Sequence, residues 1–158
     1  MNKLIVGNWK MYPTLSDSVV LAAALRKSLE DIKGVDIVLA PPLPWLLSLH
    51  EQWKHRPKNI HFAAQNIWPE DQGAFTGEAS AYFLKDIIKY AIIGHSERRR
   101  NNGEDDELVA KKVHACLKWQ ITPVICVGET KQAVFADGTI DSSQWQKLSH
   151  QMMSVLEG

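Results

Sequence analysis

One pattern constrains the fold of this chain more than any other: a short apolar run followed by an amphipathic stretch occurs five times in succession. The runs occupy residues 4–6, 37–40, 61–64, 91–93 and 123–127. Neighbouring residues within a run are apolar, rather than every second residue, so we expect both faces of each strand to be buried. Strands of this kind lie in a parallel sheet covered by helices. The repeat predicts an α/β fold in which residues 1–158 form one domain of five βα units.

The amphipathic stretches between the runs carry the start signals and apolar periodicity of helices. Their expected starts are Ser16 or Asp17, Pro44, Ser80, and Ser142 or Ser143, with a further helix around residues 108–117. Their expected buried positions include Leu21, Leu25, Leu29, Ile32, Trp45, Leu46, Leu49, Leu108, Val109, Val113, Cys116, Leu117, Trp145, Leu148, Met152, Val155 and Leu156. Residues 66–77 contain two glycines and a proline, and we expect a long ordered loop there.

Five βα units leave open how the sheet closes. An open dinucleotide-binding sheet would carry a G-x-G-x-x-G string after its first strand, and this chain has none there. A closed parallel (β/α)8 barrel typically takes about 250 residues. The sequence therefore favours a partial TIM-type barrel, with the first five of eight units present.

Composition gives no indication of a nucleic acid or polyanionic partner, since 18 basic residues balance 18 acidic ones. The basic run at 98–100 is followed by acidic residues at 104–107, and we expect a neutralised, solvated surface there. Cys116 and Cys126 lie within apolar patterns typical of reduced, buried thiols. No apolar segment approaches the roughly 20 residues of a membrane span. We therefore expect a cytoplasmic protein with no membrane partner.

Polar side chains follow four of the five predicted strands. They are Asn8 and Lys10, Gln65 and Asn66, His95 to Glu97, and Gly128 to Thr130. In a βα barrel the carboxyl ends of the strands build the active site. Each residue taken singly has an ordinary structural interpretation, as a surface lysine or a hydrogen-bonded histidine. Their occurrence at several strand ends together favours a site.

The residue types suggest the chemistry of this site. Lys10 is a compact positive charge suited to an anionic substrate. The Ser96-Glu97 pair after His95 can begin a helical turn, whose N–H groups oppose a positive charge on the imidazole. A neutral imidazole and a lysine are donors that stabilise an oxyanion forming on a carbonyl. Glu97 is expected to pair with Lys10, and Cys126 to be packed rather than nucleophilic.

Several strings in this chain resemble the N-terminal portion of triosephosphate isomerases, over about the first five βα units. They are Gly7-Asn8-Trp9-Lys10-Met11, Ala40-Pro41-Pro42, Ala64-Gln65-Asn66, Gly73-Ala74-Phe75-Thr76-Gly77-Glu78, Ile93-Gly94-His95-Ser96-Glu97-Arg98-Arg99 and Pro123-Val124-Ile125-Cys126-Val127-Gly128-Glu129-Thr130. The strings occur in the order and at the spacing of the family.

The resemblance implies an isomerase that interconverts dihydroxyacetone phosphate and glyceraldehyde 3-phosphate in glycolysis and gluconeogenesis, without metal or cofactor. Asn8, Lys10 and His95 would bind the triose phosphate. His95 would polarise its carbonyl, and Ser96 and Glu97 would support the site. The family is a homodimer whose loop after the third strand inserts into the neighbouring subunit, which assigns Phe75, Thr76, Gly77 and Glu78 to the interface.

The chain also departs from the family. The string Tyr-Glu-Pro-Val-Trp with the catalytic glutamate, the closing lid and the later phosphate-binding loops do not occur, and Asn102 stands where a phenylalanine is common. The one carboxylate after Asp141 is Glu157, on the wrong side of its βα unit. Three interpretations stay open: an isomerase component that needs a complementing C-terminal chain, a non-catalytic self-assembling βα module, and an incomplete fragment of a longer enzyme.

Overall fold

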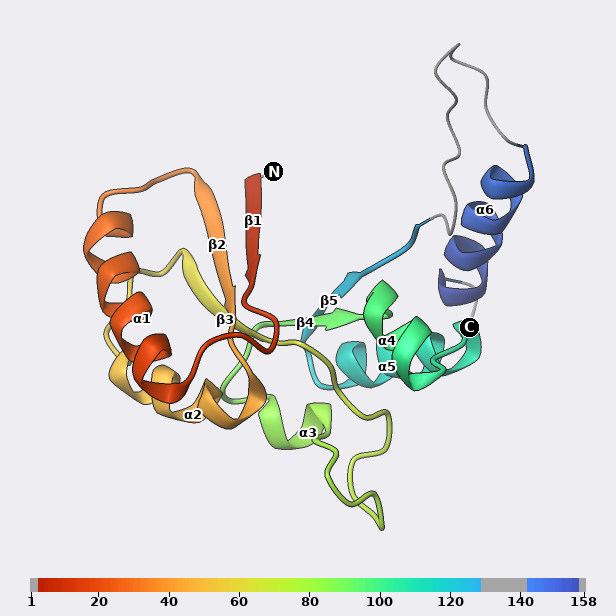
Figure 1. The fold of residues 1–158 in the computed structure, drawn as a ribbon, viewed down its shortest axis with the longest axis horizontal. Helices are drawn as coiled ribbons and strands as arrows, with labels where there is room; N and C mark the ends of the chain where they lie inside the picture. The colour runs from red at the N-terminus through yellow and green to blue at the C-terminus, as the bar shows by residue number, and fades with distance from the viewer. Residues whose placement is uncertain (1–2, 129–141, 157–158) are drawn as a thin grey trace.

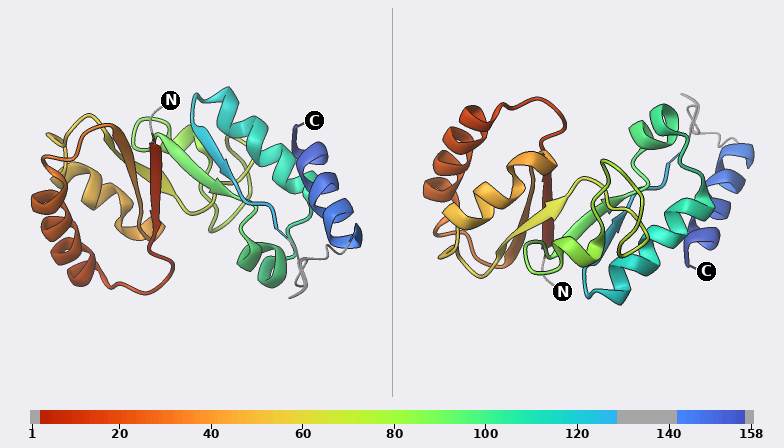
Figure 2. Two further views of the ribbon diagram at one scale, coloured as in Figure 1. Left: turned by 90° about the horizontal axis from the view of Figure 1, so that it is seen from above. Right: turned by 90° about the horizontal axis from the view of Figure 1, so that it is seen from below.

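The computed structural model describes residues 3–128 and 142–156. Five parallel strands form one sheet in the order β1-β2-β3-β4-β5. They are β1 Lys3–Asn8, β2 Val35–Ala40, β3 Ile60–Ala64, β4 Tyr90–Ile93 and β5 Thr122–Ile125. The sheet curls into a half-barrel with helices on its outer side (Figures 1 and 2). The prediction of five βα units in a partial barrel is confirmed.

Six helices lie between and after the strands in the described residues. They are α1 Leu15–Leu29, α2 Leu43–Gln52, α3 Ala81–Leu84, α4 Ser96–Asn102, α5 Asp106–Lys118 and α6 Ser142–Leu156. Helices α1 and α2 lie beside β1 to β3, whereas α5 lies beside β4 and β5 and α6 lies on the outer side of α5 (Figure 2). The residues between β3 and α3 form a long excursion, as expected for the loop at 66–77 (Figure 1).

Two predicted helix boundaries were wrong. Helix α1 is capped by Thr14, not by Ser16 or Asp17: the Thr14 hydroxyl accepts from the Asp17 N–H at 3.2 Å, and the Asp17 carboxylate accepts from the Thr14 N–H at 3.2 Å. This reciprocal pair is a capping box, which satisfies two backbone donors at once. Helix α3 ends at Leu84, not at Ile88.

The core consists of two layers on either side of the sheet. Alternate residues of β2 face opposite layers: Ile37 and Leu39 contact the outer helices, and Val38 and Ala40 line the inner face. The two-sided burial predicted for the strands therefore holds for β2. It is wrong for β1, where Leu4 is 45% and Ile5 59% exposed, because β1 is an edge strand that pairs with β2 only.

Several helix positions predicted to be buried are exposed. They are Leu21, Ile32, Leu117, Trp145, Met152 and Leu156. Helix α1 instead buries Ser18 and Ala22, whose small side chains bring its backbone close to the neighbouring elements. Helix α6 buries Gln144 and Val155 and packs mainly on α5. No helix in residues 3–128 and 142–156 has the length and apolar character to cross a membrane.

Candidate functional site

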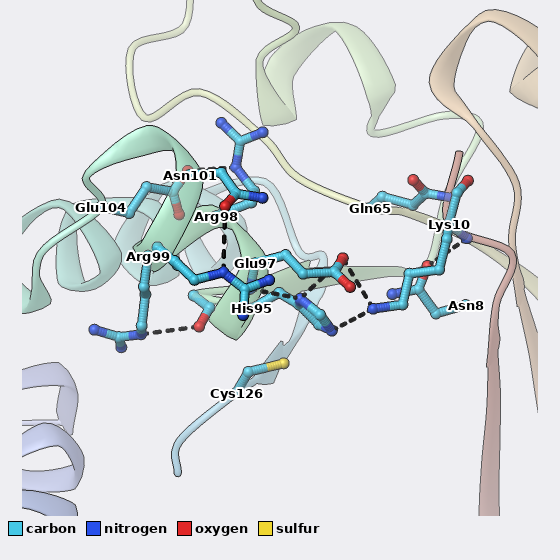
Figure 3. A network of polar contacts seen from close by, with 12 residues as sticks. Asn8, Lys10, Gln65, His95, Glu97, Arg98, Arg99, Asn101, Glu104 and Cys126 are labelled. Atoms are coloured by element: carbon cyan, nitrogen blue, oxygen red, sulfur yellow. Dashed lines mark hydrogen bonds and ion pairs between the residues drawn. The ribbon is translucent and has the colours of Figure 1, made fainter. Parts of the chain in front are cut away.

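The strand ends bring together residues that are far apart in the sequence. Lys10 follows β1, and His95 follows β4 at the start of α4. The Lys10 Nζ lies 2.8 Å from the Nε2 of His95 and 3.0 Å from the Oε2 of Glu97 (Figure 3). Three of the residues selected from the sequence therefore form one polar cluster at the carboxyl end of the sheet.

The backbone of Lys10 adopts a left-handed conformation, with φ at +56°. Such a conformation costs a non-glycine residue about 1–3 kcal/mol and is retained where surrounding contacts enforce it. The Asn8 Oδ1 accepts from the Lys10 N–H at 3.0 Å. The Gln65 Nε2 donates to the Lys10 carbonyl at 2.9 Å and to the Ala40 carbonyl at 2.8 Å. Asn8 and Gln65 thus hold the segment that aims Lys10 at His95.

The chain between β4 and His95 depends on Gly94. Its φ is +70°, and a Cβ at this position would lie 3.0 Å from the side chain of Val109 and 3.1 Å from that of Arg99. Glycine adopts this positive φ without steric penalty, and its lack of a Cβ leaves room for the Val109 and Arg99 side chains. The turn places His95 at the N-cap of α4, where its Nδ1 accepts from the Glu97 N–H at 3.2 Å.

Two contacts bear on the tautomer of the ring. A neutral imidazole has one donor and one acceptor nitrogen. The Glu97 N–H points to Nδ1 at 3.2 Å, and the Lys10 ammonium group, which can only donate, lies 2.8 Å from Nε2. The two donors therefore compete for the one acceptor nitrogen of the ring. When Nδ1 accepts from Glu97, Nε2 carries the proton, and Nε2–H and the Lys10 ammonium group can both donate to an oxygen with negative charge once the two nitrogen atoms move apart.

Glu97 pairs with Lys10, as expected from the sequence. The hydrogen bond from Lys10 lowers the pKa of the Glu97 carboxyl below its ordinary value, and the charge of Lys10 adds to this effect. A carboxylate with a lowered pKa is a poor proton acceptor, so Glu97 fixes the position of Lys10 rather than acting as a base. Ser96 is the first residue of α4, and its exposed hydroxyl has no hydrogen bond within the described part of the chain.

A second cluster was misread from the sequence. Glu104 was expected to neutralise the basic run on a solvated surface, yet the side chains of Glu104 and Lys112 are 2% and 0% exposed. The Glu104 carboxylate pairs with Arg98 and accepts from the Lys112 Nζ at 2.6 Å. The Lys112 Nζ also donates to the Asn66 Oδ1 at 2.7 Å. The cluster therefore connects the start of the long loop to α5.

Burial and pairing act in opposite directions on the Glu104 carboxyl. Burial raises its pKa, but the hydrogen bonds from Lys112 and Arg98 outweigh burial, and the net pKa is lowered. Burial likewise lowers the pKa of Lys112, against the effect of Glu104. No periodic pattern in the sequence indicates this cluster, because its members come from the loop, from α4 and the residues after it, and from α5.

The long loop presents the residues that the family resemblance assigned to a subunit interface. Phe75, Thr76, Gly77 and Glu78 are all exposed. The loop closes at its base, where the Trp68 N–H donates to the Ala79 carbonyl at 2.8 Å. Within it the rings of Trp68 and Phe75 lie 5.1 Å apart.

The remaining predicted positions have simpler surroundings. Cys126 is partly buried beside the inner layer, and burial raises the pKa of its thiol, which fits a packed rather than nucleophilic residue. Asn102 ends α4 and is exposed. Glu129, Thr130 and Glu157 lie outside the described residues. Among residues 3–128 and 142–156, no group of three or more His, Cys, Asp or Glu side chains is arranged to hold a metal ion.

Comparison with known proteins matches residues 3–156 to the triosephosphate isomerase family. A triosephosphate isomerase of Carboxydothermus hydrogenoformans is 46% identical over 127 residues, which is 80% of this chain and 50% of that protein. One from Roseiflexus castenholzii is 43% identical over 129 residues, 81% of this chain and 50% of the relative. One from Syntrophotalea carbinolica is 39% identical over 155 residues, 98% of this chain and 59% of the relative. The chain spans about half the length of these relatives, and it belongs to the triosephosphate isomerase family.

Proposed function

We propose that this chain supplies the substrate-binding and electrophilic part of a triosephosphate isomerase acting on dihydroxyacetone phosphate and glyceraldehyde 3-phosphate. The observation that supports this most strongly is the contact between the Lys10 Nζ and the His95 Nε2, which lie 2.8 Å apart. The substrate carbonyl oxygen would displace this contact, separate the two nitrogen atoms and accept from both. Lys10 also offers positive charge to the phosphate.

In the proposed reaction His95 polarises the carbonyl. As a base removes a proton from the neighbouring carbon, negative charge develops on the carbonyl oxygen, and the Nε2 proton of His95 passes to it. The ring then recovers a proton from the adjacent hydroxyl while the base returns the abstracted proton to the former carbonyl carbon, and the carbonyl is thereby moved to the other carbon. Asn8 and Glu97 position Lys10 throughout, through their contacts at 3.0 Å to its amide and its ammonium group.

The base that removes the carbon-bound proton is assigned to a complementing C-terminal polypeptide. In the described residues, Glu97 is the one carboxylate in contact with Lys10 and His95, and it is already engaged by Lys10. A positioned general base contributes about 10²–10⁴-fold to rate. We therefore expect negligible isomerase activity from this chain without a partner.

The exposed apolar residues at the sheet edges suit such a complement. Leu4 and Ile5 lie on edge strand β1, and Val127 follows edge strand β5. On α6, Trp145 and Met152 are exposed as well. Further βα units that pair with β1 and β5 would cover these side chains and close the barrel. A cytoplasmic setting and a homodimer formed through the loop around Thr76 complete the proposal.

A second candidate function follows from the same edges: a non-catalytic module that assembles with copies of itself by strand pairing. The two candidates are separated by measuring the native mass of the purified chain and then assaying isomerisation with and without a polypeptide carrying the remaining βα units of a relative. Activity that appears only with the complement supports the isomerase component. A stable self-oligomer that shows no activity with the complement supports the assembly module.

Two matched variants test the site in the complemented enzyme. His95→Gln removes the neutral imidazole donor and should reduce kcat by orders of magnitude. His114→Gln changes an exposed histidine on α5 and should leave kcat unchanged. Equal effects of the two substitutions would contradict the assignment of His95.

A further inference from the structure

A cationic cavity lies at the end of the sheet opposite to Lys10 and His95. Its volume is about 340 Å³, and its lining includes His50, Lys54, Arg56, Lys58 and His61. These residues belong to the end of α2, the connection that follows it and the start of β3, so the cavity lies where β3 begins rather than where it ends. None of them takes part in the site described above.

Arg56 is the fixed element of this cavity. Its Nε donates to the Ile60 carbonyl at 3.0 Å and its Nη1 to the Trp53 carbonyl at 3.3 Å. Its guanidinium group lies 5.2 Å from the centre of the Phe62 ring. The side chain is half-buried and is not paired with a carboxylate in the part of the chain that the structure describes. A partly desolvated cation without a counter-charge is unfavourable, and a bound anion would compensate it.

The surrounding charges add to the positive potential. Lys54 and Lys58 are exposed at the cavity and also lack a carboxylate partner among residues 3–128 and 142–156. The Lys89 Nζ lies 3.4 Å from the His61 Nε2. Two carboxylates oppose them: Asp36 lies 3.7 Å from His61, and Glu51 lies 3.7 Å from the Nδ1 of His50. Four lysine and arginine charges therefore face two carboxylates.

His61 responds to this potential. Burial lowers the pKa of its imidazole most, and the charge of Lys89 lowers it further. Asp36 raises the pKa through its charge and a hydrogen bond, the charge of Arg56 lowers it, and the net pKa is lowered. The Nδ1 of His50 is buried and has no hydrogen-bond partner among the described residues. Both rings line the cavity, so an anion bound there would lie close to them.

We propose that this cavity binds a phosphate group, either as inorganic phosphate or as the monoester of a small metabolite. The guanidinium group is planar and suited to phosphate oxygens, and Lys54 and Lys58 supply point charges at the rim. The site is separate from the isomerase centre and does not depend on the proposed function.

The test is a titration of the full chain with inorganic phosphate and, separately, with methyl phosphate, followed through the imidazole NMR signals of His61 and His95. Phosphate bound in the cavity should raise the pKa of His61 in wild type. Replacing both Lys54 and Lys58 by Gln should weaken the affinity read at His61 about fivefold, the loss expected from two exposed charges. Both residues are exposed, so the variant should retain its circular dichroism spectrum.

The matched control is Lys27→Gln, an exposed charge in the last turn of α1, which should leave the affinity at His61 unchanged. Tighter binding of methyl phosphate than of inorganic phosphate identifies a metabolite monoester as the ligand, and the reverse order identifies inorganic phosphate. Signals that shift only at His95, or equal losses in the cavity variant and the Lys27 control, would overturn the proposal.

Discussion

The side-chain amide of Gln65 donates a hydrogen bond to the carbonyl of Lys10 at 2.9 Å, and so stabilises a backbone conformation that a lysine rarely adopts. The same amide bonds the Ala40 carbonyl at 2.8 Å, which joins the ends of β1, β2 and β3 through one side chain. The position of the Lys10 ammonium group beside His95 therefore depends on Gln65, a residue that need not contact the substrate.

Replacing Gln65 by Leu should reduce both stability and affinity for the triose phosphate. The Lys10 carbonyl loses the Gln65 donor, and the Ala40 carbonyl keeps only the Trp9 N–H, at a cost of about 1–2 kcal/mol in the free energy of unfolding. The affinity for dihydroxyacetone phosphate, measured by NMR titration, should fall because Lys10 is no longer held. Gln52→Leu, on the exposed end of α2, is the control and should change neither quantity. A stability loss with unchanged affinity would contradict the positioning role of Gln65.

The Lys10–Glu97 contact predicts a pH dependence. Lys10 lowers the pKa of Glu97 in the folded chain, so the contact contributes at pH values above the ordinary glutamate value of 4.5 and is lost as the pH falls through the lowered folded value. Replacing Lys10 by Met should raise the pKa of Glu97, measured from the side-chain carboxyl signal by NMR. A Glu97 pKa that does not move in this variant would show that Lys10 is not the main cause of its shift.

The buried Glu104–Lys112 pair predicts a large stability difference between two similar substitutions. Glu104→Gln leaves the buried ammonium group of Lys112 without its counter-charge and should cost about 3–5 kcal/mol of unfolding free energy. Glu107→Gln breaks a pair with Lys111 whose side chains are 75% and 58% exposed, and should cost less than about 1 kcal/mol. The unfolding free energies of both variants are measured by urea denaturation. Similar losses in the two variants would contradict the importance of burial.

Gln120 offers a route to a more stable chain. Its φ of +58° places a side chain in the left-handed region just before β5. Gln120→Gly should raise the free energy of unfolding by up to about 1 kcal/mol, because glycine carries no steric penalty there. Gln146→Gly, within the exposed side of α6, should lower it by about 1 kcal/mol. Destabilisation by Gln120→Gly in a thermal melt would show that its side chain contributes more than the strain it carries.

The sequence predicted the elements of this fold better than their contacts. The five strands are recognisable because parallel strands consist of consecutive apolar residues, and the site residues because they follow those strands. The capping role of Thr14 was missed because three neighbouring polar residues compete for the same position. The exposure of Trp145 and Met152 was missed because periodicity indicates an apolar face but not the element that covers it.

The contacts that hold the site residues in position could not be predicted from the sequence either. The left-handed backbone of Lys10 and its contacts with Gln65 join residues from different strand ends, and the burial of Glu104 and Lys112 arises only when α4 and α5 pack together. Local composition suggested a solvated charge pair, since acidic and basic residues are close in the sequence. The packing of α4 and α5 determines that the Glu104–Lys112 pair is buried rather than exposed to solvent.

The most direct test of the account is an isomerase assay of the purified chain, first without a partner and then with a separately produced polypeptide that carries the remaining βα units of the Carboxydothermus hydrogenoformans relative. The account predicts negligible turnover in the first case, and in the second case turnover that is lost on His95→Gln. Near-normal turnover of the chain without a partner would contradict the claim that its base comes from another polypeptide.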